Sequence, residues 1–324
     1  MSAFVHSQMA RILAAFAATP GVDFKTLPIA EARASADAAS IAWNEGAPDI
    51  PAREIAVSAD GASLRGRFYH PKPGTALPVI VYVHGGGWTF GSVDTHDGTM
   101  RTLAAASGCA VFGFDYRLAP EHPYPTPLDD TVAAIAFALA GELGPDVDAR
   151  RWALAGDSAG ATLALAAMIQ RRDAGLALPA TAALFYGCYA PDFATGSHAR
   201  FGEGYLLTTA NMRWYWRNYL GAAFDVPPVP AAPLHADLAG LPPLYLTAGG
   251  LDPLADDTLR LADRLAAAGV AFRHDHVPGV VHGCLRMSRK LAPAQAMIDA
   301  AAAYITERLS KHQGSETSWN AGLS

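Results

Sequence analysis

The chain contains several short, continuous apolar runs rich in β-branched residues, and segments with helical spacing of apolar residues separate them. Continuous runs of this kind are typical of strands that a parallel sheet buries on both faces. The runs span residues 78–83, 110–114, 152–155, 180–186 and 243–247. The helical segments between them span residues 98–107, 127–140, 159–172 and 254–268. Because strands that alternate with helices indicate βαβ units, we predict an α/β fold with a mostly parallel, doubly wound sheet.

The elements at either end of this series differ from its middle. Residues 53–58 and 63–69 flank an Ala-Asp-Gly turn and predict a β-hairpin ahead of the parallel strands. A last strand is expected at 272–277, followed by a loop and a closing helix at 292–309. The charged residues of the strand at 272–277 suggest a protected sheet edge, although the same edge offers a route to a homodimer by strand pairing.

Three segments lie outside the regular alternation. Residues 1–45 are rich in alanine and predict one or two helices. Residues 187–229 carry many aromatic side chains between two strand signals, so we interpret them as an insertion over the sheet. Residues 311–324 are small and polar, which predicts a disordered tail.

The composition of the 324 residues predicts a folded protein and argues against two kinds of partner. Apolar and aromatic residues make up 51% of the chain and charged residues 17%, enough apolar surface to bury a large core. The 24 basic residues are outnumbered by 30 acidic ones, which gives a net charge of -6 at pH 7. This charge balance makes nucleic acid or an anionic membrane surface an unfavourable partner.

The cysteines and the apolar stretches bear on where the protein resides. Cys109, Cys188 and Cys284 are sparse and include no CxxC pair, so we expect neither a disulfide framework nor a metal cluster, and we predict a reducing, cytoplasmic location. The apolar stretch 12–18 resembles the core of a signal peptide, but its spacing favours an amphipathic helix. No run reaches the ~20 apolar residues that a membrane span needs, so we expect no span.

A G-x-S-x-G pattern follows the apolar strand at 152–155 and precedes a helical segment, in the sequence Gly156-Asp157-Ser158-Ala159-Gly160. A nucleophilic serine on such a sharp strand-to-helix turn needs small residues two positions before and two after it. Alternative interpretations are an idle serine in a glycine-rich turn or a phosphate-binding loop, but the Lys-Ser/Thr pair of a phosphate loop is missing. We therefore predict that Ser158 is a nucleophile.

A serine nucleophile needs a base, and the base needs an acid that orients it. His282 lies in a glycine-flanked turn after the last predicted strand, where loops gather at the carboxyl end of a sheet. Asp252 directly follows the strand at 243–247 and its glycines, and it precedes a proline that can open a helix. We rank His282 above His274 and His276, which share one face of a strand, and Asp252 above two acids at the next helix start, Asp256 and Asp257.

A second glycine-rich signature, His84-Gly85-Gly86-Gly87-Trp88, follows the strand at 78–83. Consecutive glycines leave backbone N–H groups free to point at a developing oxyanion, where one lost donor typically costs on the order of 10²–10³ in kcat. A glycine run alone would be a flexible loop, so its position after a strand and its coexistence with the serine turn decide the interpretation. We expect His84 to brace this loop and not to act as a second base.

These motifs together resemble one enzyme family, the hormone-sensitive-lipase-like esterases, also called bacterial family IV carboxylesterases. The matching segments, in chain order, are His84 to Trp88, Phe90-Gly-Ser-Val-Asp-Thr-His96, Asp115-Tyr-Arg-Leu-Ala-Pro-Glu-His-Pro123, Gly156 to Gly160, Asp252-Pro-Leu254 and His282-Gly283. The resemblance covers about residues 50 to 308. It implies an α/β-hydrolase fold and an enzyme without a metal or cofactor.

Carried over residue by residue, the resemblance implies a catalytic triad of Ser158, Asp252 and His282. It implies an oxyanion hole formed by the N–H groups of Gly86, Gly87 and Ala159. It also implies that Asp115, Arg117 and Glu121 form a buried polar network that holds a loop.

The resemblance further implies a helical cap over the pocket and hence a division of the chain. Its expected parts are residues 1–45 as the N-terminal part of the cap, 46–186 as the first part of the hydrolase core, 187–229 as the cap insertion, 230–310 as the second part of the core, and 311–324 as the tail.

Two features depart from the family pattern. The position after Gly283 is often Phe in relatives and is Cys284 here, so we expect a changed pocket wall beside the base. The consecutive residues Trp214, Tyr215 and Trp216 cannot share one side of a helix, so we expect one or two to anchor the cap and one to line the pocket.

The sequence thus predicts a serine carboxylesterase that acts on small, relatively apolar acyl esters. One alternative is an amidase or lactone hydrolase that uses the same triad. The other is a non-catalytic receptor for a small ligand on a hydrolase fold, although such receptors have lost the base and His282 is present here.

Overall fold

The computed structural model describes residues 3–19 and 23–320 and has one central eight-stranded sheet in the order β1-β2-β4-β3-β5-β6-β7-β8. β2 pairs antiparallel with both β1 and β4, and every other neighbouring pair is parallel. The strands are β1 (Ala52–Ala59), β2 (Ala62–Tyr69), β3 (Leu77–Val83), β4 (Ala110–Phe114), β5 (Val147–Asp157), β6 (Ala182–Phe185), β7 (Leu244–Leu251) and β8 (Phe272–Val281). The predicted α/β class, the hairpin and the parallel sheet are confirmed.

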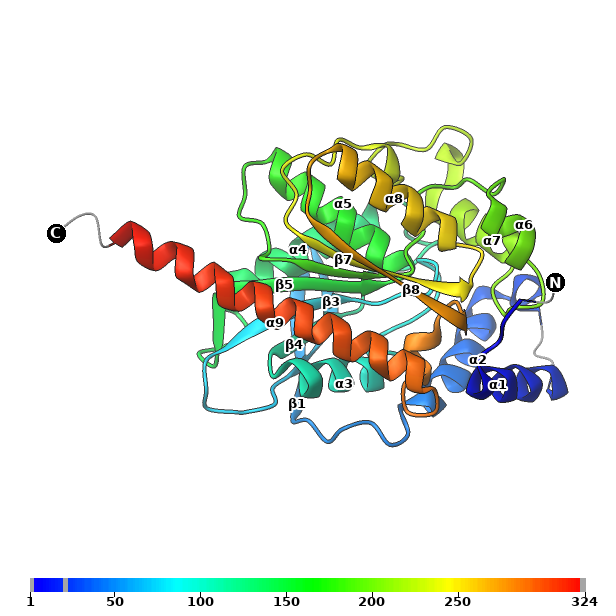
Figure 1. Ribbon diagram of the computed structural model, residues 1–324, viewed down its shortest axis with the longest axis horizontal. Coiled ribbons are helices and arrows are strands. Elements are labelled where there is room, and N and C mark those ends of the chain that lie inside the picture. The colour runs from blue at the N-terminus through cyan, green and yellow to red at the C-terminus, as the bar shows by residue number, and fades with distance from the viewer. Residues whose placement is uncertain (1–2, 20–22, 321–324) are drawn as a thin grey trace.

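Helices cover both faces of the sheet, as Figure 1 shows, with α4, α5 and α8 on one face and α3 and α9 on the other. Their bounds are α3 (Asp97–Ser107), α4 (Thr126–Leu139), α5 (Ala159–Asp173), α8 (Ala255–Ala267) and α9 (Ala292–Asn320). Two apolar clusters fill the two layers, one centred on β3, β5 and α5 and the other on α3 and α9. Both faces of the middle strands are therefore buried, which explains why their sequences are continuous apolar runs.

The remaining helices gather at the end of the sheet where the parallel strands finish (Figure 1). They are α1 (Ser7–Ala18) and α2 (Ile29–Ile41) from the N-terminal segment, and α6 (Gly196–Phe201) and α7 (Thr209–Leu220) from the insertion. Short 3₁₀ turns accompany them, η1 (Phe24–Thr26) and η2 (Ala42–Asn44) after α1 and α2, and η3 (Gly221–Ala223) after α7. Two segments far apart in the sequence thus meet over one edge of the sheet.

Two elements near the carboxyl terminus run further than the sequence predicts. β8 continues to Val281 beyond the expected end at residue 277, and its pairing with β7 shifts register between Gly249 and Leu251. α9 continues past residue 309 to Asn320, through much of the segment expected to be a disordered tail, and residues 321–324 lie outside the described residues. In the described part of the chain, no helix combines the length and apolarity needed to cross a bilayer.

Candidate active site

Ser158 sits on the turn between β5 and α5 with φ 54° and ψ -122°. Positive φ is uncommon for a non-glycine residue and costs backbone energy, so the packing around the turn must impose it. A Cβ at Gly160 would collide with the carbonyl oxygen of Val83, and a Cβ at Gly156 would lie 2.7 Å from the carbonyl carbon of Gly160. Only glycine fits at both positions, and this close approach holds the serine at the carboxyl end of β5.

The structure brings Ser158, His282 and Asp252 into one chain of hydrogen bonds. The Nε2 atom of His282 lies 2.9 Å from the Oγ atom of Ser158, and its Nδ1 atom lies 2.8 Å from Oδ2 of Asp252. Asp252 follows β7, His282 follows β8, and these neighbouring parallel strands end side by side. An ionised Asp252 accepts the Nδ1–H of the imidazole, which leaves the Nε2 lone pair facing the serine hydroxyl.

Asp252 and His282 are each held by further contacts. Asp252 is 0% exposed, and its second oxygen, Oδ1, accepts the backbone N–H of Leu254 at 2.8 Å. The imidazole of His282 packs edge-on against Tyr186, with ring centroids 4.8 Å apart. The carboxylate and the ring are therefore fixed before any ligand binds, which favours one tautomer and one orientation of the imidazole.

The residues that the sequence ranks below these have other surroundings. Asp256 accepts the backbone N–H of Ser197 at 2.8 Å. Asp257 is buried, and burial raises its pKa well above the ordinary range of an aspartate. His274 and His276 lie within β8, before the turn that carries His282. None of these four hydrogen-bonds to Ser158 in the described part of the chain.

The glycine loop after β3 lies directly over the serine turn. Gly86 and Gly87 have φ values of 118° and 60°, and a Cβ at Gly87 would overlap the ring of Tyr215 from α7. Within the residues that the structure describes, the N–H groups of Gly86, Gly87 and Ala159 have no protein acceptor. Free amide donors beside an attacking oxygen are the arrangement that an oxyanion hole requires.

Asp157 connects the glycine loop to the serine turn, a role that the sequence reasoning missed. Its Oδ1 atom accepts the hydroxyl of Tyr82 at 2.8 Å and the backbone N–H of Gly85 at 3.0 Å, and it lies 3.5 Å from Nε2 of His96. Burial alone would raise the pKa of Asp157, but His96 and these hydrogen bonds hold it well below its ordinary value. The only sequence signal for this contact was that Gly85 and Asp157 each lie inside one of the matching motifs.

His84 has the contacts expected of a residue that braces the loop. Its ring stacks on Tyr116 with centroids 4.3 Å apart, and its Nδ1 atom lies 2.8 Å from the carbonyl oxygen of Gly85. Burial lowers the pKa of His84 to about 3, so the imidazole is neutral at physiological pH. A neutral ring makes Nδ1 the donor to Gly85.

A cavity of about 460 Å³ opens above Ser158 and His282. Its floor includes Gly86 and Gly87, and its walls come from both the N-terminal segment and the insertion. The wall residues are Phe16, Phe24, Ala36, Asp37, Ala39, Ser40 and Trp43 from the first, and Leu206, Leu207, Asn211, Met212 and Tyr215 from the second. The lining is mainly apolar, with a few polar groups, as in many small-molecule sites.

The aromatic triplet on α7 divides as expected. Tyr215 lines the cavity and covers Gly87, whereas Trp216 is fully buried against Trp88 with ring centroids 4.5 Å apart. Trp214 is half-buried and contacts Phe24.

Cys284 does not form the pocket wall that the sequence led us to expect. It is 0% exposed, and its sulfur lies 3.7 Å from the sulfur of Met297 in α9. A 3₁₀ turn, η5 (Cys284–Met287), starts directly after Gly283 and rotates this side chain away from the cavity into the core.

The expected polar network of Asp115, Arg117 and Glu121 is three separate interactions. Asp115 accepts the N–H of Val93 at 2.6 Å, and burial raises the pKa of this carboxyl to about 6. The guanidinium of Arg117 pairs with buried Asp130 at 2.7 Å. Glu121 is 44% exposed and pairs with Arg33 of α2 at 2.7 Å, so it joins the N-terminal segment to the core and is not part of a buried cluster.

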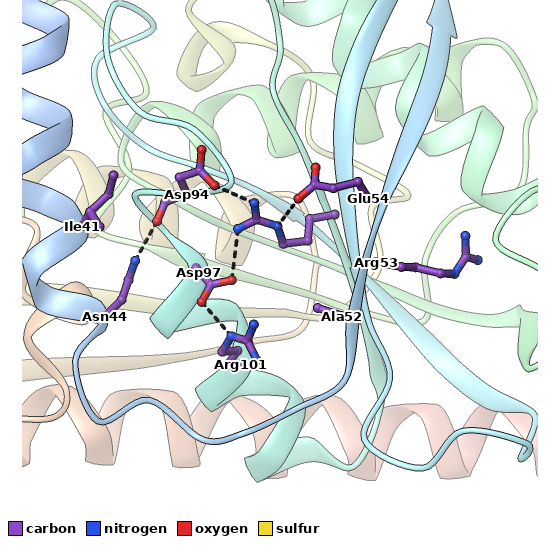
Figure 2. Close-up of a pocket in the computed structure, with 9 residues that line it drawn as sticks. Ile41, Asn44, Ala52, Arg53, Glu54, Asp94, Asp97 and Arg101 are labelled. Atoms are coloured by element: carbon purple, nitrogen blue, oxygen red, sulfur yellow. Dashed lines mark hydrogen bonds and ion pairs between the residues drawn. The ribbon is translucent and has the colours of Figure 1, made fainter.

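A second cavity of about 490 Å³ lies between the hairpin β1–β2, the start of α3 and the N-terminal segment. Figure 2 shows Glu54, Asp94 and Asp97 converging on one guanidinium, with Arg101 beyond Asp97. The guanidinium belongs to Arg67, whose nitrogens lie 2.6 Å from Glu54, 2.6 Å from Asp94 and 3.1 Å from Asp97. These charges compensate one another, so the cavity is a site of structural ion pairs.

Comparison with known proteins identifies relatives over most of the chain. Residues 80–286 match a family model described by the alpha/beta hydrolase fold. The esterase LipI of Mycobacterium tuberculosis is 37% identical over 241 residues, which cover 73% of this chain and 75% of LipI. An acetyl esterase of Salmonella schwarzengrund is 32% identical over 270 residues, which cover 82% of this chain and 83% of the relative.

Solved structures show the same fold. An ester hydrolase from the metagenome of Lake Arreo superposes with a TM-score of 0.90 at 34% identity and covers 95% of this chain and 100% of its own. An esterase of the archaeon Pyrobaculum calidifontis superposes with a TM-score of 0.89 at 31% identity and covers 94% of this chain and 98% of its own. The chain therefore belongs to the hormone-sensitive-lipase-like family, bacterial family IV, of the α/β-hydrolase superfamily.

Proposed function

We propose that the protein is a serine carboxylesterase that hydrolyses short, relatively apolar acyl esters through an acyl-enzyme. The observation that carries this proposal is the chain of hydrogen bonds from Ser158 through His282 to Asp252 at the floor of the 460 Å³ cavity. The names of the relatives, which are esterases, carboxylesterases and acetyl esterases, support it.

In the first half of the reaction, Ser158 attacks the ester carbonyl while Nε2 of His282 takes its proton. Asp252 holds the imidazole in the required tautomer and stabilises the imidazolium that forms. The carbonyl oxygen gains negative charge and accepts hydrogen bonds from the N–H groups of Gly86, Gly87 and Ala159. When the tetrahedral intermediate collapses, its C–O bond to the alcohol breaks and His282 returns the proton to the leaving alkoxide.

In the second half, water replaces the alcohol. His282 removes a proton from the water, whose oxygen attacks the acyl carbon within reach of the same amide donors. Collapse of this second intermediate breaks the bond to Ser158, and the serine oxygen takes the proton from His282. The products are the carboxylic acid and the free enzyme, so the cycle needs no metal or cofactor.

Labelling with a fluorophosphonate probe tests the nucleophile directly. We expect one adduct on Ser158, found by mass spectrometry, together with loss of p-nitrophenyl acetate hydrolysis. The variant Ser158→Ala should remain folded, take up no label and lose several orders of magnitude in kcat. A wild-type protein that takes up no label would instead favour a non-catalytic receptor, and cleavage of anilides or lactones in preference to esters would favour the amidase or lactonase alternative.

We also infer a cytoplasmic homodimer. Cys109, Cys188 and Cys284 are all free and buried, which suits a reducing compartment. β8 is an edge strand of the sheet, so a second copy could pair with it. Light scattering on the purified protein tests the assembly, and a single-copy mass across concentrations would reject the dimer.

A further inference from the structure

One charged side chain in the cavity takes no part in the chemistry described above. Arg286 lines the same cavity as Ser158 and His282 and is half-buried. Its Nη2 atom lies 3.7 Å from the position of a Cβ on Gly283, so the guanidinium sits over the turn next to His282. η5 places it there, because the turn that points Cys284 into the core points Arg286 toward the cavity.

The hydrogen bonds of Arg286 leave most of its donors unused. Its Nη1 atom donates to the Oγ atom of Ser40 in α2 at 2.6 Å, and Ser40 also lines the cavity. A guanidinium has five N–H donors in a planar fork suited to a carboxylate. Within the described residues, no carboxylate lies in ion-pair range of Arg286.

Ten arginines of the chain have an acidic partner, and Arg286 is among the others that, within the described residues, have none. Ion pairs with acidic side chains hold Arg33, Arg65, Arg67, Arg101, Arg117, Arg150, Arg151, Arg172, Arg260 and Arg273. Burial makes an unpaired charge costly, and a bound anion would lower this cost for Arg286 because its side chain lines the cavity. Its field reaches the reacting end of the cavity, since the positive charge of Arg286 helps to hold the pKa of Asp157 low and opposes the rise that burial causes in the pKa of Tyr215.

The two acidic groups that share the cavity, Asp157 and Asp37, form no ion pair with Arg286 in the described part of the chain. Asp157 is occupied by Tyr82, Gly85 and His96. The pKa of Asp37 is raised, first by burial and then by the charge of Asp94. Asp37 would repel a bound anion, so its effect should be opposite in sign to that of Arg286.

Given the esterase function proposed above, on which this inference rests, we propose that Arg286 is a specificity residue. It selects esters that carry a carboxylate on an apolar spacer, such as monoesters of dicarboxylic acids. The guanidinium donates two parallel hydrogen bonds to the carboxylate, and the spacer packs against the apolar walls of the cavity. Hydrolysis then proceeds at the ester carbonyl as for a neutral substrate.

Two pairs of isosteric substrates test this proposal. Monoethyl adipate is compared with ethyl adipamate for an anion in the acyl part, and acetoxybutyrate is compared with acetoxybutyramide for an anion in the alcohol part. The measured quantity is the ratio of kcat/KM for the carboxylate to that for the amide, by titration of released acid. We expect a ratio of roughly ten or more in one of the pairs, as a hydrogen-bonded charge pair provides, and a decrease with added salt.

Variants test whether Arg286 causes the ratio of kcat/KM between carboxylate and amide substrates. Arg286→Gln should bring it to one or below, Arg286→Lys should restore part of it, and Asp37→Asn should raise it. Arg289→Gln is the matched control, because Arg289 is exposed and outside the cavity lining. If Arg286→Gln fails to fold, Arg286→Lys and Asp37→Asn still move the ratio in opposite directions.

Two results would overturn the proposal. One is a ratio near one in both substrate pairs with the wild-type enzyme. The other is an unchanged ratio in Arg286→Gln, which would mean that Arg286 serves only to hydrogen-bond Ser40 of α2. Either leaves the esterase function intact as long as p-nitrophenyl acetate is cleaved and Ser158 is labelled. An enzyme that cleaves no ester and takes up no label fails the proposed function itself.

Discussion

Asp157 directly precedes the nucleophile Ser158 and also holds the glycine loop by a hydrogen bond. Its carboxylate holds the N–H of Gly85 and faces His96. In Asp157→Asn the shape is kept but the charge is lost, and one amide donor replaces an acceptor. We expect kcat for p-nitrophenyl acetate to fall about tenfold to a hundredfold with a smaller change in KM, because misplaced amide donors affect chiefly the transition state.

Asp256→Asn is the matched control for this change, since Asp256 also accepts a backbone N–H but lies outside the cavity lining. Its kcat should stay at the wild-type value. An Asp157→Asn enzyme with unchanged kcat and normal stability would show that the carboxylate does not position the loop.

His84 makes stability depend on pH through its buried, neutral ring. Burial lowers its pKa from 6.5 to about 3. Between these values the unfolded chain binds a proton that the folded chain does not. The stability that depends on a neutral His84 is therefore fully present above pH 6.5, and it is lost as the pH falls toward 3. By pH 4 the loss is on the order of 3 kcal/mol.

His84→Asn removes this titration and can keep a donor toward Gly85. We expect the free energy of unfolding to fall less between neutral pH and pH ~4 in the variant than in the wild type, measured by urea denaturation. Other titrating groups, including Asp115 with its raised pKa, act in both proteins and cancel in the difference. Parallel pH profiles for the two proteins would mean that His84 is not buried as a neutral ring.

In the sequence Ser158, Asp252 and His282 each follow a predicted strand, and they lie within hydrogen-bond distance in the structure because parallel strands end together. Side-chain directions a few positions beyond a strand are harder to predict from the sequence. A 3₁₀ turn rotates by about 120° per residue, so Cys284 and Arg286 point about 120° apart although only one residue separates them. No pattern in a single sequence shows where such a turn starts.

At the scale of elements, the buried centre of each strand is easier to predict than its ends. β8 is the clearest case, since Pro278 and Gly279 indicate a loop in the sequence and yet lie inside the strand. The strand tolerates them because it forms the sheet edge, where a missing N–H breaks no ladder, and because its pairing with β7 shifts register nearby. An edge position depends on the whole topology and not on the local residues.

The contact between the glycine loop and α7 is a cluster of aromatic rings. Trp88 stacks on Tyr219 with ring centroids 4.3 Å apart and packs at a tilt against Trp216 with centroids 4.5 Å apart. Trp216→Ala leaves a large cavity under the loop, so we expect a loss of about 3–5 kcal/mol in the free energy of unfolding. Trp214→Ala, at a half-buried neighbour on the same helix, should cost less than half as much. Denaturant unfolding of both variants checks this order, and the reverse order would contradict the assigned anchor.

At the scale of the molecule, the cavity exists only because two distant segments meet. The N-terminal segment supplies seven lining residues, the insertion supplies five, and the core supplies the rest. Arg33 of α2 ties the N-terminal segment to the core through Glu121 and the carbonyl oxygens of Thr89 and Ala119. Periodicity can place helices in these segments, but it says nothing of which helix covers which part of a sheet. The resemblance to a family supplied that expectation, whereas the depth and lining of the cavity required the structure.

The two wall segments should set acyl-chain selectivity together. Phe24 of the N-terminal segment contacts Phe90 and Tyr215, and Leu207 of the insertion lines the same cavity. Shortening either side chain enlarges a mainly apolar space, where each added CH₂ of substrate gains about 0.8 kcal/mol by burial. We expect Phe24→Ala and Leu207→Ala each to shift the best p-nitrophenyl ester toward a longer acyl chain. The double variant should shift it further.

The test is a series of p-nitrophenyl esters of increasing acyl length, with kcat/KM as the readout. Val226→Ala is the control, because Val226 lies in the insertion but is 82% exposed and outside the lining. A shift in Phe24→Ala alone would place the acyl chain against the N-terminal segment, and a shift in Leu207→Ala alone would place it against the insertion. If neither variant changes the profile, the acyl chain does not reach these walls, and chain length must be limited closer to Ser158.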